Sequence, residues 1–139
     1  MHDMYNNLLP ARAISPIASS GGNAILTTQT LDTQGYQTAM LYILIGNLAD
    51  AGATFTVEIQ ESATDFSGAA IDDAKLNVDE ANVSFDEADD DSVRRIEVHD
   101  MLRYLQATIT PAGNADVAFF CAMWLLGNPR HRPVTAQAT

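Results

Sequence analysis

Within residues 53–62, ATFTVEIQES, apolar and polar side chains alternate, and no other feature of the sequence limits the possible folds as much. The apolar members of the alternation are Phe55, Val57 and Ile59. Successive side chains of a β-strand point to opposite faces of a sheet. The segment therefore predicts a strand with one face in a core and the other in water.

The same period of two returns along most of the chain. The other segments that show it, or that are rich in Thr and aliphatic residues, are 24–31, 36–48, 92–100, 102–113 and 116–126. A helical period occurs only in fragments, such as a short turn at 72–76. We therefore expect an all-β protein, built as an antiparallel β-sandwich of jelly-roll-like type or as a barrel, with about 6–8 strands.

Two of these segments, 36–48 and 116–126, are apolar on both faces. This pattern predicts central strands, and for 116–126 it equally allows an outer face that meets another subunit. Trp124, the sole tryptophan, lies in the second segment, where a place in the core is more plausible than a sugar-binding platform. Cys121 lies there too and is expected to act as a small buried hydrophobe. Gly113–Asn114 is a strong signal for a tight turn before this strand.

The organisation that we expect is an extended N-terminal arm at 1–22, a β-sandwich domain at 23–127 and a short irregular C-terminal tail at 128–139. Pro10 and Pro16 each remove a backbone donor and disfavour helix, and the following SSGG supplies a flexible joint. Apolar residues on an irregular arm need a surface to lie on. That surface is either the arm's own domain or a neighbouring protein.

Candidate partner-binding residues come from both extremities. The candidates are Tyr5, Leu8, Leu9, Ile14 and Ile17 from the arm, and Arg130, His131 and Arg132 from the tail. The basic residues lie in GNPRHRP, between two prolines that restrict the backbone, so little entropy is lost when the guanidinium groups pair with carboxylates of a neighbour. The alternative is that they pair with carboxylates of their own domain.

Charge and cysteine content exclude several classes of protein. With 7 basic against 18 acidic residues, the net charge is −11, and nucleic acid is not an expected partner. A single cysteine excludes an internal disulfide framework. The longest apolar run, 117–126, is far shorter than a membrane-spanning helix requires, and the N-terminus does not have the pattern of a signal peptide. We expect a soluble protein that contacts no membrane.

Catalytic and ligand-binding motifs are not found in the sequence. It contains no nucleophile elbow, no phosphate-binding glycine loop and no histidine pair with zinc-ligand spacing. Seven of the thirteen residues from Asp79 to Asp91 are acidic, but they lack the alternation and the glycine of a calcium loop. This run is expected to be a solvated loop. We therefore expect no enzyme activity, cofactor, metal or small-molecule ligand.

The strand VAFFCAMWLLG running directly into NPRHRPV resembles small proteins of tailed bacteriophages that are often encoded near the major capsid protein. The segments LDTQGYQTAMLYILIG, FTVEIQESATDFSG and RRIEVHDMLRYLQATITPAGNADVAFF are similar to the usual layout of that group. The chain differs from the commoner tails at Arg132, where a small residue is frequent, and in the acidity of 79–91.

This resemblance implies a capsid decoration, or cement, protein that binds the outside of the major capsid protein lattice and stabilises it. It further implies a homotrimer on the outer virion surface, synthesised in the cytoplasm of a host bacterium. Alternative functions are a head–tail, neck or tail structural protein and a carbohydrate-binding β-sandwich module.

Overall fold

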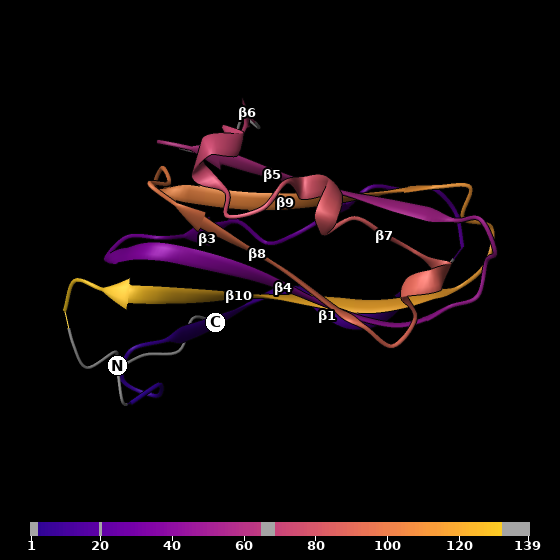
Figure 1. Cartoon of the computed structure of the whole chain (residues 1–139), viewed down its shortest axis with the longest axis horizontal. Coiled ribbons are helices and arrows are strands. Elements are labelled where there is room, and N and C mark those ends of the chain that lie inside the picture. Colours follow the sequence, from indigo (N-terminus) through magenta and orange to yellow (C-terminus); the bar gives the residue numbers. More distant parts are fainter. Residues whose placement is uncertain (1–2, 20, 65–68, 132–139) are drawn as a thin grey trace.

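Two antiparallel β-sheets packed face to face form the protein, as Figure 1 shows for the computed structural model, which describes residues 3–19, 21–64 and 69–131. The first sheet has the strand order β1-β10-β4-β8. Its strands are β1 (Leu9–Ser19), β10 (Ala118–Pro129), β4 (Tyr36–Leu48) and β8 (Val93–His99). Both segments with two apolar faces are therefore central strands, as expected.

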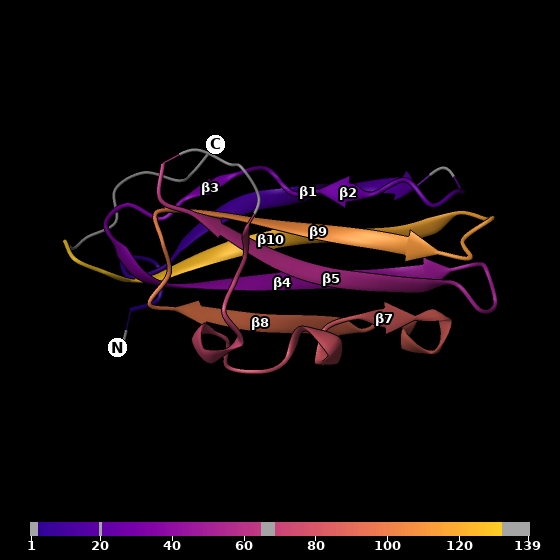
Figure 2. The same cartoon turned by 90° about the horizontal axis from the view of Figure 1, so that it is seen from above.

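The second sheet has the order β2-β9-β5-β6, with β3 also pairing with β9 and β7 with β5. Its strands are β2 (Leu26–Thr27), β3 (Leu31–Asp32), β5 (Thr54–Ser62), β6 (Ala69–Ala70), β7 (Phe85–Asp86) and β9 (Tyr104–Ala112). Figure 2 shows the two sheets from above, with β9 and β5 lying over β10 and β4. The predicted all-β class is confirmed, and of sandwich and barrel the structure is the sandwich.

The core lies between the sheets and follows the predicted alternation. Phe55, Val57 and Ile59 point inward from β5 and are buried, and Trp124 is fully buried on β10. The ring of Phe55 stacks on that of Phe85 with centroids 4.9 Å apart, and both rings meet Phe120 edge-on. This aromatic cluster ties β7, β5 and β10 together across the two sheets.

The acidic segment is more ordered than the solvated loop that we expected. Two 3-10 turns lie within it, η2 (Glu80–Asn82) and η3 (Glu87–Asp89), and a third, η1 (Asp73–Lys75), precedes it where the sequence predicted a short turn at 72–76. Each is preceded by an aspartate whose carboxylate accepts a backbone N–H of the turn, which is a helix-capping contact. The carboxylates therefore fix the backbone locally in addition to facing water.

The same segment covers an edge of β5. Ser84 Oγ accepts the N–H of Val57 at 3.1 Å, and Glu80 Oε1 accepts the N–H of Ile59. Val83 and Phe85 hold the segment in place because their side chains are buried. An edge strand left uncovered is a site of aggregation, so this contact protects the sheet.

The expected boundary at residue 22 differs from the structure, because β1 is part of the sandwich. Leu9 pairs with Leu126, and the strand continues beside β10 with register shifts on either side of Ile14. The two prolines are tolerated because β1 is an edge strand, where a missing donor breaks no ladder on the open side. Of the two surfaces considered for the arm, residues 9–19 lie on their own domain.

The other boundary also moves, because β10 extends to Pro129 rather than ending at Gly127. Pro129 pairs with Tyr36 in the ladder to β4, and the N–H of Arg130 donates to the carbonyl of Gly35 at 2.8 Å. The first half of GNPRHRP is thus held by regular strand pairing. Among the described residues, no helix is long and apolar enough to span a membrane.

Candidate interaction surface

The two outer faces of the sandwich differ in chemistry. The outward side chains of β5 and β9 are mainly polar: Thr54, Thr56, Glu58, Gln60, Tyr104, Gln106, Thr108 and Thr110. The outward side chains of β4 and β10 are mainly apolar: Met40, Tyr42, Leu44, Phe119, Cys121, Met123 and Leu125. We call this second set the apolar face.

The apolar face is continuous because its residues are register partners. Cys121 lies opposite Leu44, and Leu125 lies opposite Met40. Leu44 is 43% exposed and Phe119 is 48% exposed. Contiguous exposed apolar surface of this kind marks an interaction site more often than isolated exposed residues do. Cys121 is half-buried on this face rather than buried in the core as expected.

A hollow of about 290 Å³ opens at one end of the apolar face. Its lining is Pro16, Leu44, Ile45, Gly46, Phe119, Phe120 and Cys121. We call it the apolar hollow. A side chain at Gly46 would meet the carbonyl oxygen of Phe119 at 3.2 Å, so the absent Cβ allows the two strands to approach at the register shift there.

Carboxylates adjoin the apolar hollow. The N–H of Asp91 donates to the carbonyl of Gly46 at 3.3 Å, and Asp90 Oδ1 accepts the N–H of Leu48 at 2.8 Å. Asp91 is exposed, and its carboxylate has no hydrogen-bond or ion-pair partner within the described ranges. This end of the molecule therefore combines an apolar depression with an unpaired negative charge.

The N-terminal turn lies at the opposite end of the same face. The N–H groups of Asn7 and Leu8 donate to the carbonyl of Met4 at 3.2 and 3.0 Å, which closes the turn. The side chain of Leu8 comes within 3.6 Å of the Cβ position of Gly127. The N-terminal turn and the end of β10, which lie far apart in the sequence, are therefore close together in the structure.

The arm residues predicted to bind a partner fall into two groups. Tyr5 is 80% exposed at the turn and Leu8 is half-buried. Leu9 packs against the core and Ile14 is 8% exposed within it, so Ile14 is not available to a partner in this fold. The backbone of Ile17 pairs with Phe120. Ile14 departs from the expectation because β1 turns that side chain into the sandwich.

The tail residues Arg130 and His131 are both exposed, and Arg132 lies outside the described residues. The ion pairs found in the described part of the chain are Lys75–Glu61, Arg94–Asp89 and Arg103–Asp32. Arg130 takes part in none of them, although the chain carries a large excess of carboxylates. Its guanidinium is therefore available to another molecule.

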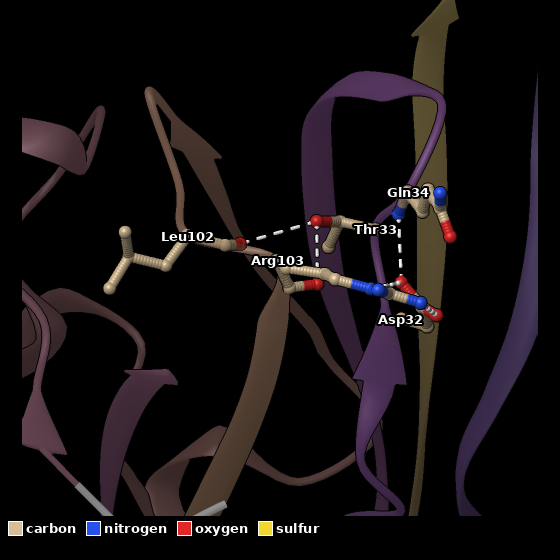
Figure 3. Close-up of polar contacts among 5 residues, drawn as sticks. All are labelled: Asp32, Thr33, Gln34, Leu102 and Arg103. Atoms are coloured by element: carbon tan, nitrogen blue, oxygen red, sulfur yellow. Dashed lines mark hydrogen bonds and ion pairs between the residues drawn. The ribbon is translucent and has the colours of Figure 1, made fainter. Parts of the chain in front are cut away.

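A polar cluster, which Figure 3 shows, joins the end of β3 to the residues just before β9 and precedes Gly35, whose carbonyl accepts the N–H of Arg130. Arg103 donates to both carboxylate oxygens of Asp32, at 3.1 and 2.8 Å, and these hydrogen bonds lower the pKa of that carboxyl below its ordinary value. The hydroxyl of Thr33 donates to the carbonyl of Arg103 at 2.8 Å, and the N–H of Gln34 donates to Asp32. The cluster leads directly into Gly35, which accepts the N–H of Arg130.

A polar hollow of about 600 Å³ surrounds this position. Its lining is Tyr36, Gln37, Thr38, His99, Asp100, Met101, Asn128 and Arg130. Burial raises the pKa of the Tyr36 phenol above its ordinary value. No group of three or more His, Cys, Asp or Glu side chains that could hold a metal occurs within residues 3–19, 21–64 and 69–131.

The sequence pattern predicts a second apolar side for 36–48 and 116–126, but Met40, Leu44, Phe119 and Met123 are not among the candidate partner-binding residues. The signal was present, since these residues share one parity along each strand. The sequence does not show that these two strands are neighbours in the sheet. Their pairing joins the apolar residues of both strands into one continuous face.

Comparison with known proteins identifies no family. No protein-family model matches the chain, and no curated protein matches it. One similar solved structure comes from work on Bacillus endospore appendages that form disulfide-linked pili, with 12% identity and a TM-score of 0.44 over 91% of this chain and 96% of the other. Another is the infectious bursal disease virus Gx strain, with 9% identity and a TM-score of 0.46 over 86% of this chain and 31% of the other.

Proposed function

We propose that the chain is a structural protein without catalytic activity that binds other protein subunits through the apolar face. The observation that carries the proposal is the contrast between the two sheets. One outer face has the polar side chains expected of a surface in water, whereas the other exposes Leu44 and Phe119 on two neighbouring central strands. Burying such side chains stabilises an interface by roughly 25 cal/mol per Å² before the costs of association.

In its specific form, the proposal is that the chain decorates the head of a tailed bacteriophage. The partners are the major capsid protein and two further copies of the chain, and the site of action is the outer capsid surface after synthesis in the host cytoplasm. Support for this form comes from the sequence resemblance described above. The apolar face provides a contact area, and the exposed Arg130 provides a cation for carboxylates of the shell or of a sister subunit.

The experiment is binding of the purified chain to empty shells assembled from the proposed partner, the major capsid protein, measured by co-sedimentation and electron microscopy. Met123→Lys places a charge in the middle of the apolar face. The matched control is Thr108→Lys, which places the same charge on the polar outer face of β9. We expect Met123→Lys to weaken binding at least tenfold and Thr108→Lys to leave it within twofold.

Thermal unfolding of both variants checks that they remain folded. Unchanged shell binding by folded Met123→Lys would overturn the assignment of the apolar face. Absence of wild-type binding to shells, together with a ring-shaped complex at the neck or tail, would replace capsid decoration with the head–tail alternative.

A further inference from the structure

The two ends of the apolar face carry complementary features that one copy cannot bring together. At one end are the apolar hollow and the unpaired carboxylate of Asp91. At the other are the exposed side chains of Met4 and Tyr5, 67% and 80% accessible, and the unpaired Arg130. Phe119 and Gly127 mark the two ends on β10 and are eight residues apart, or roughly 26 Å along a strand.

We propose that a second copy of this chain docks its Met4–Tyr5 turn into the apolar hollow, with its Arg130 beside Asp91. The contact is heterologous, because one copy contributes the turn and the other contributes the hollow. The inference rests on the proposed role of the apolar face as a contact surface. It specifies which part of one copy meets which part of the next.

The shape of the turn supports this occupant. Its backbone is closed by the two hydrogen bonds to the carbonyl of Met4, and Asp3 accepts further hydrogen bonds from Asn6. An aromatic side chain held on a fixed turn loses little conformational freedom when it is buried, and one tyrosine can bury about 150–250 Å². An exposed hydrophobic group and an empty apolar hollow on the same chain are each unfavourable in water, and one contact removes both.

Charge supports the same pairing. Among the described residues, Arg130 is an exposed cation without an ion pair, and it follows Gly127, against which Leu8 of the turn lies, by three residues. Asp91 hydrogen-bonds through its backbone to Gly46, which lines the hollow. Placing the turn in the hollow therefore brings a guanidinium to a carboxylate, and their pairing favours this orientation of the two copies over the reverse.

The area of the apolar face explains why the protruding turn is needed. The two strands that carry the apolar face span about 10 Å, and the length between the two ends is roughly 26 Å, so a flat contact covers less than about 300 Å² per partner. A standard interface buries roughly 800 Å² per partner. The turn and the charged rim supply contacts beyond the flat area. A heterologous contact that closes on itself gives a ring, and the proposed trimer is such a ring.

Cys121, the single cysteine of the chain, lines the hollow and provides the test. Tyr5→Cys, oxidised gently in the full chain, is expected to form disulfide-linked species of two or more copies on non-reducing electrophoresis. Adding Cys121→Ala to the same chain should abolish them. The control is Ile25→Cys, since Ile25 is 61% exposed and lies beside β2 of the other sheet.

A charge exchange gives a second, independent measurement by sedimentation velocity. Arg130→Glu and Asp91→Lys are each expected to weaken self-association at least tenfold, and a chain that carries both changes should regain most of it. The inference is overturned if Tyr5→Cys links no better than Ile25→Cys, or if the double exchange restores nothing. A chain that still binds shells but fails these tests refutes the docking mode and leaves the proposed function standing.

Discussion

The aromatic cluster leads to a prediction about the acidic segment, because Phe85 is the largest side chain anchoring that segment to the sandwich. Phe85 is 3% exposed, stacks on Phe55 at 4.9 Å and meets Phe120 edge-on at 5.5 Å. Phe85→Ala removes both ring contacts and leaves a cavity, which costs about 3–5 kcal/mol of the free energy of unfolding. Phe85→Leu keeps most of the apolar volume and loses the two ring contacts, at about 0.5–1.5 kcal/mol each.

Urea unfolding measures these losses. With a slope of about 2 kcal/mol per M, the unfolding midpoint of Phe85→Ala is expected to fall by about 1.5–2.5 M. Val78→Ala is the matched control, since Val78 lies in the same part of the chain but is 37% exposed, and it should change stability by less than about 0.5 kcal/mol.

Hydrogen exchange tests where the damage occurs. The amides of Val57 and Ile59 donate to Ser84 and Glu80, so they should lose protection when the segment detaches. A loss in Phe85→Ala no larger than in Val78→Ala, or unchanged exchange at these two amides, would refute the view that the ring anchors the segment.

Two carboxyl groups predict opposite pH effects. Burial, with smaller contributions from neighbouring carboxylates, raises the pKa of Glu80, so its stabilising contribution is complete below the ordinary glutamate pKa and is lost as the pH rises through the raised value. Glu80→Gln keeps an oxygen for the Ile59 amide and should melt above wild type at neutral pH, with the difference shrinking on acidification; a constant difference across the titration would contradict this. The pKa of Asp32 is lowered, so the stability from its pairing with Arg103 is present above the ordinary aspartate pKa and is lost as the pH falls through the lowered value. Asp32→Asn should therefore lower the melting temperature slightly at neutral pH but not in strong acid, and since the pair is nearly half exposed, a large effect at neutral pH would be unexpected.

The sequence predicted the elements whose pattern is local. The alternation in 53–62 gave β5 with its inward face, and the apolar segments 36–48 and 116–126 gave the two central strands. It did not predict β1, because Pro10 and Pro16 are evidence against a strand unless the strand is known to lie at an edge. Edge position depends on pairing with β10, and no local pattern records that pairing.

The acidic segment differs from the expected solvated loop for a related reason. Like charges close together favour a solvated loop, but Asp79 and Asp86 relieve the repulsion by accepting backbone N–H groups, and Val83 and Phe85 anchor the segment from within. The candidate partner-binding residues also divide into those whose position follows from the local sequence and one whose position depends on long-range strand pairing. Tyr5 and Arg130 are exposed, as residues that bind a partner must be, whereas Ile14 is in the core because of a strand that the sequence did not show.

The position of β10 has a consequence for biosynthesis. It lies between β1 and β4 in the sheet, yet a ribosome makes it after every other strand of the sandwich. Until β10 emerges, β1 has no mate and β4 exposes a long apolar edge, so the first sheet closes only as a late, long-range event. Before β10 is synthesised, the nascent chain must therefore avoid pairing the unpaired edges of β1 and β4 with other proteins.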